Sequence, residues 1–273
     1  MQSEQEQESV KMPALTTNDS AVLHALFDAE SSPSSAISID PTLPPLPQNL
    51  QTTPTDHEAL SSREKSIIAS IQDNHDSGAA RTIHAAIEAL NTLIEEHPTY
   101  PSAYVNRAQA LRMLVDSDGD AKEEKPVLFT NPANATTSSR LLADLGHAIN
   151  LSTPSSPADP VSTVQARILA DAHTHRGYLL LKAARAKKDV SCEGESKMRG
   201  SGSGSVWDLG PDQLGEMASR DFSFGGRYGN KIAQQMAVQT NPYAKMCGAI
   251  VKEAMKKETE GVGSAGFSPS IRT

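Results

Sequence analysis

The sequence predicts an all-α protein of three helix pairs and a closing helix, and three observations support this prediction. Apolar residues recur at intervals of three and four residues in several stretches, as they do along the buried face of an α-helix. Pro98 and Pro101 lie between two such stretches, where they would end one helix and open the next. Aromatic residues make up only 4% of the 273 residues, so much of the chain cannot bury enough apolar surface to offset its ordering entropy. We therefore expect one small helical domain with long tails and inserts.

The helical pattern is centred on residues 103–114, AYVNRAQALRML. Tyr104, Ala108 and Leu111 lie on one helical face, where a large, a small and an apolar side chain allow a second helix to pack closely. With a proline on either side, this stretch resembles the first helix of a tetratricopeptide repeat. Such repeats stack into a right-handed superhelix, and three pairs with a capping helix are the smallest array expected to be stable alone.

Residues 1–55 are predicted to be a mostly disordered tail with a short helix at residues 18–28. Asn18 or Asp19 would cap this helix, and a Ser/Pro-rich extended linker that includes residues 41–47 would follow it. Because a short isolated helix is marginal in water, it should either pack onto its own domain or dock onto a partner, two readings of about equal weight. We predict that it occupies the groove of its own domain in the free protein.

The repeat domain is predicted over residues 56–258. Its first pair comprises a helix at residues 57–72 and one from Ala79 that stops at His97-Pro98. The second pair comprises the helix with residues 103–114 and a partner resuming at Arg140. A polar insert, residues 116–138, separates them.

The third pair comprises a long helix from Val161 to about Lys187 and a helix at residues 214–224. A charged and Gly/Ser-rich insert, residues 188–210, joins them. Two further stretches have a helical pattern, residues 228–240 and a last helix that starts at Asn241-Pro242. Residues 259–273 are predicted to be a disordered tail.

Composition excludes several classes of function. The net charge of −8 argues against nucleic acid or an anionic membrane as the main partner, because both require a basic surface. Cys192 and Cys247 are too few for a disulfide framework or a thiolate metal site. The amino terminus has no signal region and no run of about 18 apolar residues occurs, so we expect a cytoplasmic location, with a nuclear one also open.

Candidate chemical motifs are weak. His173 and His175 are two residues apart and would point to different faces of a helix, so an ordinary polar role outweighs a metal site. The acidic run from Asp116 to Asp120 lacks the twelve-residue pattern of a calcium loop. No nucleophile, base or cofactor motif is present, so we expect no enzyme, no cofactor and no metal.

The chain also resembles the tetratricopeptide-repeat protein 36 family. The stretch Asn18–Phe27 is similar to the opening motif of that family, Ala103–Ala110 to its second repeat and Arg176-Gly177 to its third. Arg220-Asp221-Phe222, followed by Asn241–Ala244 with Cys247, resembles its closing signature. The resemblance implies a non-enzymatic protein associated with chaperone binding and with tyrosine metabolism.

Repeat proteins that grip the acidic carboxy terminus of a chaperone use a clamp of Lys, Asn, Asn, Lys and Arg side chains. The resemblance places Asn106 at one clamp position, and Arg63 can replace the first lysine. Ile67 stands at the first asparagine position, and Asp171 and His175 stand at the lysine and arginine positions. Because Asp171 would repel an acidic tail, we expect that this clamp does not bind one.

We predict a concave groove, formed by the first helix of each pair, that binds a peptide or protein segment. The candidate groove residues are Arg63, Tyr104, Asn106, Arg107, His173 and Arg176. For Arg107 the alternative is that its stem packs against the next repeat. The predicted function is a monomeric, co-chaperone-like adaptor, whose partner is a heat-shock chaperone or a metabolic enzyme. The alternative is a scaffold that stabilises an enzyme of tyrosine metabolism through its convex face or its inserts.

Overall fold

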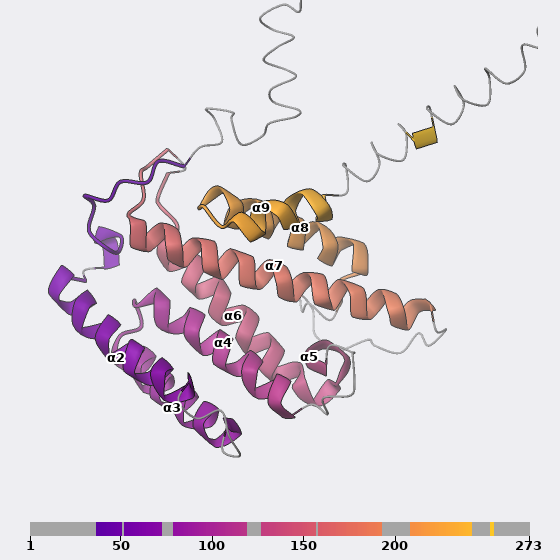
Figure 1. Ribbon diagram of the computed structural model, residues 1–273, viewed down its shortest axis with the longest axis horizontal. Helices are drawn as coiled ribbons and strands as arrows, with labels where there is room; N and C mark the ends of the chain where they lie inside the picture. The colour runs from indigo at the N-terminus through magenta and orange to yellow at the C-terminus, as the bar shows by residue number, and fades with distance from the viewer. Residues whose placement is uncertain are drawn as a thin grey trace, which may run out of the picture. The chain divides into compact units, whose positions relative to one another are not determined.

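The computed structural model describes residues 37–50, 52–72, 79–118, 127–156, 158–192, 208–241 and 252–253. The chain divides into two units, Met1–Ile37 and Ser38–Thr273, and the features below belong to the second. Within the described ranges every regular element is a helix, which confirms the predicted all-α class (Figure 1). The predicted helix at residues 18–28, the tail at 259–273 and nearly all of the predicted last helix lie outside the described residues.

Seven long helices form the described part of the domain, joined in places by short helical turns. The long helices are α2 (Pro54–Gln72), α3 (Ala79–Glu96), α4 (Pro101–Asp118), α6 (Ala135–Ser152), α7 (Thr163–Cys192), α8 (Pro211–Arg227) and α9 (Lys231–Thr240). The short turns are η1 (Gln48–Leu50), α5 (Val127–Thr130) and η2 (Pro132–Asn134). Several predicted helix bounds lie within three residues of the observed ones. These are both ends of the predicted helices at 57–72 and 214–224, and the predicted start at Ala79.

The predicted inserts are shorter than expected. Helix α4 continues to Asp118 and α6 begins at Ala135, so both run into the predicted insert at 116–138. The turn α5 in the same insert buries Leu128 and Phe129, two adjacent apolar side chains that anchor it to the core. Helix α7 likewise continues to Cys192, into the predicted insert at 188–210.

The helices pack against their neighbours in chain order, from α2 with α3 to α8 with α9. Figure 1 shows α7 lying between α6 on one side and the α8–α9 pair on the other. One continuous apolar core runs through these contacts, and its largest fully buried side chains include Leu90, Leu93, Leu141, Leu145, Leu169, Leu180 and Phe222. Each helix therefore depends on its neighbours for burial of its apolar face.

The 103–114 stretch packs much as the sequence predicts. Ala103 and Ala108 are fully buried and Leu111 is buried, which allows α3 and α6 to approach α4 closely. Tyr104 is only half-buried, and its hydroxyl donates to the carbonyl oxygen of Pro98 at 3.0 Å. The fully buried aromatic at this end of the helix is Tyr100, just before α4.

The Ser/Pro-rich stretch before α2 is held against the start of α7. Asp40 and Ser38 pair through their backbones with Val161, with N···O distances of 2.9 Å each. Ser162 donates its hydroxyl to the carbonyl oxygen of Pro45 at 2.7 Å, and Leu46 is buried. A segment that the sequence predicts as a linker thus contributes one side chain to the core.

Helices α7, α8 and α9 approach closely where α8 has no side chain. A Cβ atom added to Gly225 would lie 2.6 Å from Thr174 Oγ1 of α7 and 3.1 Å from Ala233 Cβ of α9. A Cβ atom on Gly226 would lie 2.7 Å from Gln234 Cγ. These two glycines let α8 fit between its neighbours.

Gly225→Ala is therefore expected to lower the free energy of unfolding by about 1–3 kcal/mol, because the added methyl group overpacks the contact. Urea unfolding followed by circular dichroism measures this change. The matched control is Gly215→Ala in the same helix, where a Cβ atom would meet nothing within 4 Å. That control should be stabilised by roughly 0.5–1 kcal/mol, because alanine favours a helix over glycine. Equal effects of the two substitutions would contradict the close approach at Gly225.

Candidate functional site

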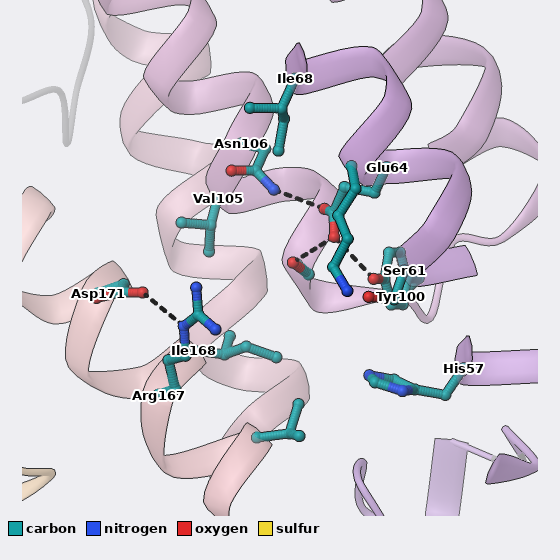
Figure 2. Close-up of a pocket in the computed structure, with 13 residues that line it drawn as sticks. His57, Ser61, Glu64, Ile68, Tyr100, Val105, Asn106, Arg167, Ile168 and Asp171 are labelled. Atoms are coloured by element: carbon teal, nitrogen blue, oxygen red, sulfur yellow. Dashed lines mark hydrogen bonds and ion pairs between the residues drawn. The ribbon is translucent and has the colours of Figure 1, made fainter. Parts of the chain in front are cut away.

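A cavity of about 380 Å³ opens between α2, α4 and α7. Its lining comes from the first helix of each of the three predicted pairs, with Tyr100 from the turn before α4 (Figure 2). The volume lies in the range of small-ligand and side-chain pockets. Four aliphatic side chains, Ile68, Val105, Val164 and Ile168, form its apolar lining. We call this feature the α2–α4–α7 cavity.

Glu64 of α2 is the central polar residue of the cavity and is only 5% exposed. Its Oε2 accepts hydrogen bonds from the hydroxyls of Tyr100 and Ser102, each at 2.8 Å, and its Oε1 accepts one from Nδ2 of Asn106 at 2.7 Å. Burial raises the pKa of Tyr100 far above its usual value, and the nearby Glu64 carboxylate raises it further. Tyr100 therefore remains a hydrogen-bond donor at any physiological pH.

Glu64 is not among the site residues that the sequence predicts. Leu60 lies four residues before it and Ile68 four residues after it, so Glu64 interrupts the apolar stripe that predicts α2. A charged residue within such a stripe is the signal that indicates a buried polar site, since buried carboxylates need several hydrogen-bond donors.

Other titratable side chains also line the cavity around Glu64, among them His57, Arg167 and Asp171. Burial lowers the pKa of His57, and the attraction of Glu64 only partly opposes this, so His57 is neutral at pH 7. Partial burial raises the pKa of Asp171, and the adjacent Arg167 opposes the rise. Arg167 Nε lies 3.9 Å from Asp171 Oδ2, the Arg167 side chain is largely exposed and the Asp171 side chain is about half exposed, so this ion pair is weak.

Of the six predicted groove residues, Asn106 is the one that lines the α2–α4–α7 cavity. Arg63 lies on the exposed surface of α2 and forms an ion pair with Glu96 of α3. Tyr104 packs against His147 of α6, with ring centroids 5.7 Å apart.

Arg107 lies between helices and is 8% exposed. Its Nε and Nη2 atoms donate to Asp144 of α6 at 2.8 and 2.6 Å, and its Nη1 donates to Asn91 of α3 at 3.0 Å. The guanidinium also lies 5.5 Å from the centre of the Tyr104 ring. The hydrogen bonds of Arg107 therefore go to α6 of its own helix pair and to α3 of the preceding pair, whereas the alternative interpretation places its stem against the next repeat.

His173 and Arg176 of α7 both bind Asp221 of α8. His173 Nδ1 donates to Oδ1 at 2.8 Å, and the Arg176 guanidinium contacts both carboxylate oxygens at 2.7 Å. Burial alone would raise the pKa of Asp221, but the hydrogen bonds and charges of His173 and Arg176 together hold it below its usual value. These two predicted residues therefore link α7 to α8 and do not line the cavity.

The positions compared with a chaperone clamp offer little positive charge. Ile67 is half-buried on α2, and Asp171 is a carboxylate. Burial, assisted by the positive charge of Arg112, lowers the pKa of His175 to about 4, so this side chain is neutral at pH 7. A terminal carboxylate would find no cation at the last two clamp positions.

Within the described ranges, no three His, Cys, Asp or Glu side chains gather as a metal site. In the same part of the chain, no helix has both the length and the apolar character needed to cross a membrane.

Comparison with known proteins adds two relatives. No protein-family model matches the chain, and no solved structure matches it. The chain is 26% identical over 246 residues to Tetratricopeptide repeat protein 36 of Danio rerio, covering 89% of this chain and 94% of that protein. It is 64% identical over 250 residues to the L-tyrosine degradation gene cluster protein hmgX of Aspergillus fumigatus, covering 92% of this chain and 95% of that protein. At that identity and coverage, the chain belongs to the family of the L-tyrosine degradation gene cluster protein hmgX.

Proposed function

We propose that this chain is a non-enzymatic adaptor with a superhelix of the tetratricopeptide type, and that the α2–α4–α7 cavity belongs to a groove that binds a protein segment. The observation that carries the proposal is the lining of the cavity, which comes from the first helix of each of three successive pairs. In arrays of stacked helix pairs, the first helices share one face and form an extended concave surface. The distant similarity to Tetratricopeptide repeat protein 36 supports the same architecture.

The chemistry of the cavity suits a segment of polypeptide. Aliphatic side chains provide apolar surface for a side chain, while Asn106 provides an amide for the polypeptide backbone. Asn106 donates through Nδ2 to Glu64, which leaves its Oδ1 atom to accept from a bound backbone N–H. A few fixed polar groups within an apolar lining are typical of a recognition pocket.

The partner that we propose is an enzyme of tyrosine degradation, which the adaptor stabilises or assembles. The observation in favour is the relative at 64% identity, whose name refers to an L-tyrosine degradation gene cluster. A heat-shock chaperone is the second candidate. It would have to bind without an acidic tail in the clamp, because Asp171 and a neutral His175 occupy two of the clamp positions.

The test of the groove is a substitution that fills it. Ser61 lines the cavity from α2, whereas its neighbour Ser62 is exposed and does not line it. Ser61→Arg should reduce the partner captured from cells that use tyrosine as carbon source by about tenfold or more, because a long side chain would fill the space that the segment needs. Ser62→Arg should leave capture unchanged. Quantitative mass spectrometry of the captured proteins measures both, and circular dichroism checks that helix content is kept.

Replacing residues 193–207 with a Gly/Ser linker of the same length tests whether the groove or this insert is the contact, because it leaves α7 and α8 intact. If the partner is retained in the linker variant and lost in Ser61→Arg, the groove is the contact. If the partner is lost in the linker variant and retained in Ser61→Arg, the groove proposal is overturned and the insert is the contact.

A further inference from the structure

Glu64 is a buried carboxylate that takes part in no ion pair within the described part of the chain. The two other buried carboxylates there, Asp144 and Asp221, are each paired with a base on a neighbouring helix. Its three hydrogen-bond donors, Tyr100, Ser102 and Asn106, are all neutral. A buried charge is costly when only neutral groups compensate it, so a cation that reached Glu64 would gain a favourable contact.

The hydrogen bonds also leave room for one more donor. A carboxylate offers about four acceptor positions, and the three donors use two on Oε2 and one on Oε1. The remaining position is on Oε1. Figure 2 shows Glu64 and Asn106 joined on one side of the cavity, with Arg167 and Asp171 joined to each other on α7.

We propose that the α2–α4–α7 cavity receives an arginine or lysine side chain of the partner segment, with Glu64 as its counter-ion. The proposal rests on the proposed groove function and specifies the chemistry of the partner. The aliphatic lining, Ile68, Val105, Val164 and Ile168, suits the methylene stem of such a side chain, whose charged end needs a polar partner. Asp171 adds a second carboxylate to the lining.

Two cations of the chain itself, Lys65 and Arg167, also line the cavity. Lys65 is exposed, and the Arg167 side chain is 85% exposed, so solvent and salt screen both charges. Glu64 is buried, where screening is weaker, and its attraction therefore outweighs their repulsion for a side chain inside the cavity. An acidic side chain in the same place would meet Glu64 and be repelled.

The test uses capped Gly/Ser peptides that differ in one central residue: arginine, lysine, norleucine or glutamate. Norleucine matches the lysine stem without its charge. The arginine and lysine peptides should shift the NMR signals of residues 61–68, Asn106 and 164–171 of the full chain, with saturation at millimolar concentration. The norleucine peptide should bind about tenfold more weakly, the scale of one charge-assisted hydrogen bond, and the glutamate peptide should not bind.

Glu64→Gln should weaken binding of the lysine peptide by about tenfold, because it removes the charge and keeps the shape. The matched control is Glu58→Gln, an exposed position on the same helix, which should leave binding unchanged. Asp171→Asn should weaken it by about threefold, since that side chain is about half exposed. Asp171→Asn keeps the test decisive if Glu64→Gln does not fold, because the Asp171 side chain is exposed and its loss should be tolerated.

The proposal is overturned if the norleucine peptide binds as well as the lysine peptide, if the glutamate peptide binds best, if no peptide saturates, or if folded Glu64→Gln keeps full affinity. These failures differ from failure of the groove function. If no peptide binds while Ser61→Arg still abolishes partner capture, the groove function is supported and its specificity for a cationic side chain is contradicted. If the lysine peptide binds while Ser61→Arg still captures the partner, the cation site is supported and the proposal that the partner binds in the groove is contradicted.

Discussion

Asp144→Ala is expected to lower the free energy of unfolding by about 3–5 kcal/mol, because it leaves the Arg107 guanidinium buried without a counter-ion. The Arg107 side chain is 10% exposed and that of Asp144 is 4% exposed, so water cannot replace the lost carboxylate without a rearrangement of α4 and α6. Among the described residues, the guanidinium would keep its hydrogen bond to Asn91 and its cation–π contact with the Tyr104 ring. Neither residue carries a negative charge. Urea unfolding at pH 7, followed by circular dichroism, measures the change.

Two controls separate the lost charge from the lost contact. Replacing both partners, as Arg107→Met with Asp144→Leu, should restore stability to within about 2 kcal/mol of the natural chain, because no buried charge is left unpaired. Asn91 would keep its hydrogen bond from Arg140, at 2.7 Å. Asp116→Ala removes an exposed ion-pair partner of Arg112 and should cost about 1 kcal/mol or less. If the double variant is as unstable as Asp144→Ala, the unpaired charge of Arg107 is not the cause of the loss of stability.

The helices are predictable from sequence because their signals are local. Helix α3, for example, carries Ile83, Ile87, Leu90 and Ile94 at intervals of three and four, and all four are buried. The turn α5 is not predictable in the same way, because Val127, Leu128 and Phe129 form one short apolar run within a polar stretch and show no period. The burial of Leu128 and Phe129 depends on contacts with α4, α6 and α7 that sequence spacing does not encode.

The candidate site was less predictable because its contacts join distant residues. Glu64 is bound by donors 36, 38 and 42 positions further along the chain. Asn106 was predicted from the resemblance, whereas Glu64 falls outside every motif. The sequence predicts Arg107 either in the groove or against the next repeat, whereas its buried hydrogen bonds go to Asp144 of its own helix pair and to Asn91 of the preceding pair.

Two motifs that the sequence presents separately meet in the structure. Arg176 of the Arg176-Gly177 pair binds Asp221 of the Arg220-Asp221-Phe222 motif. A Cβ atom on Gly177 would lie 3.1 Å from the Phe222 ring, so glycine leaves the space into which Phe222 packs. The two motifs therefore join α7 to α8 in two ways: Arg176 and Asp221 form an ion pair, and Phe222 packs into the space beside Gly177.

Asp221→Asn is expected to lower the free energy of unfolding at pH 7 by about 3 kcal/mol, at the low end of the range for a broken buried ion pair. The low end applies because Arg176, with a side chain 29% exposed, can turn partly to solvent, whereas Asp221 is 5% exposed. Asparagine keeps the shape of the side chain, so the loss reports the charge rather than a cavity. Asp212→Asn in the exposed first turn of the same helix is the matched control, and it should cost about 1 kcal/mol or less.

The pH dependence distinguishes this ion pair from simple packing. His173 and Arg176 hold the pKa of Asp221 in the folded state below the usual value of 3.8, so the unfolded chain takes up a proton at higher pH than the folded chain. The contribution of Asp221 is therefore complete above about pH 4, declines as the pH falls below that value, and is lost once the pH passes the folded pKa. The difference in unfolding free energy between the natural chain and Asp221→Asn should shrink over that interval, as measured by urea unfolding at a series of pH values. A difference that stays constant from pH 7 to pH 3 would mean that Asp221 stabilises the α7–α8 contact by its shape, and that the ion pair with His173 and Arg176 contributes nothing.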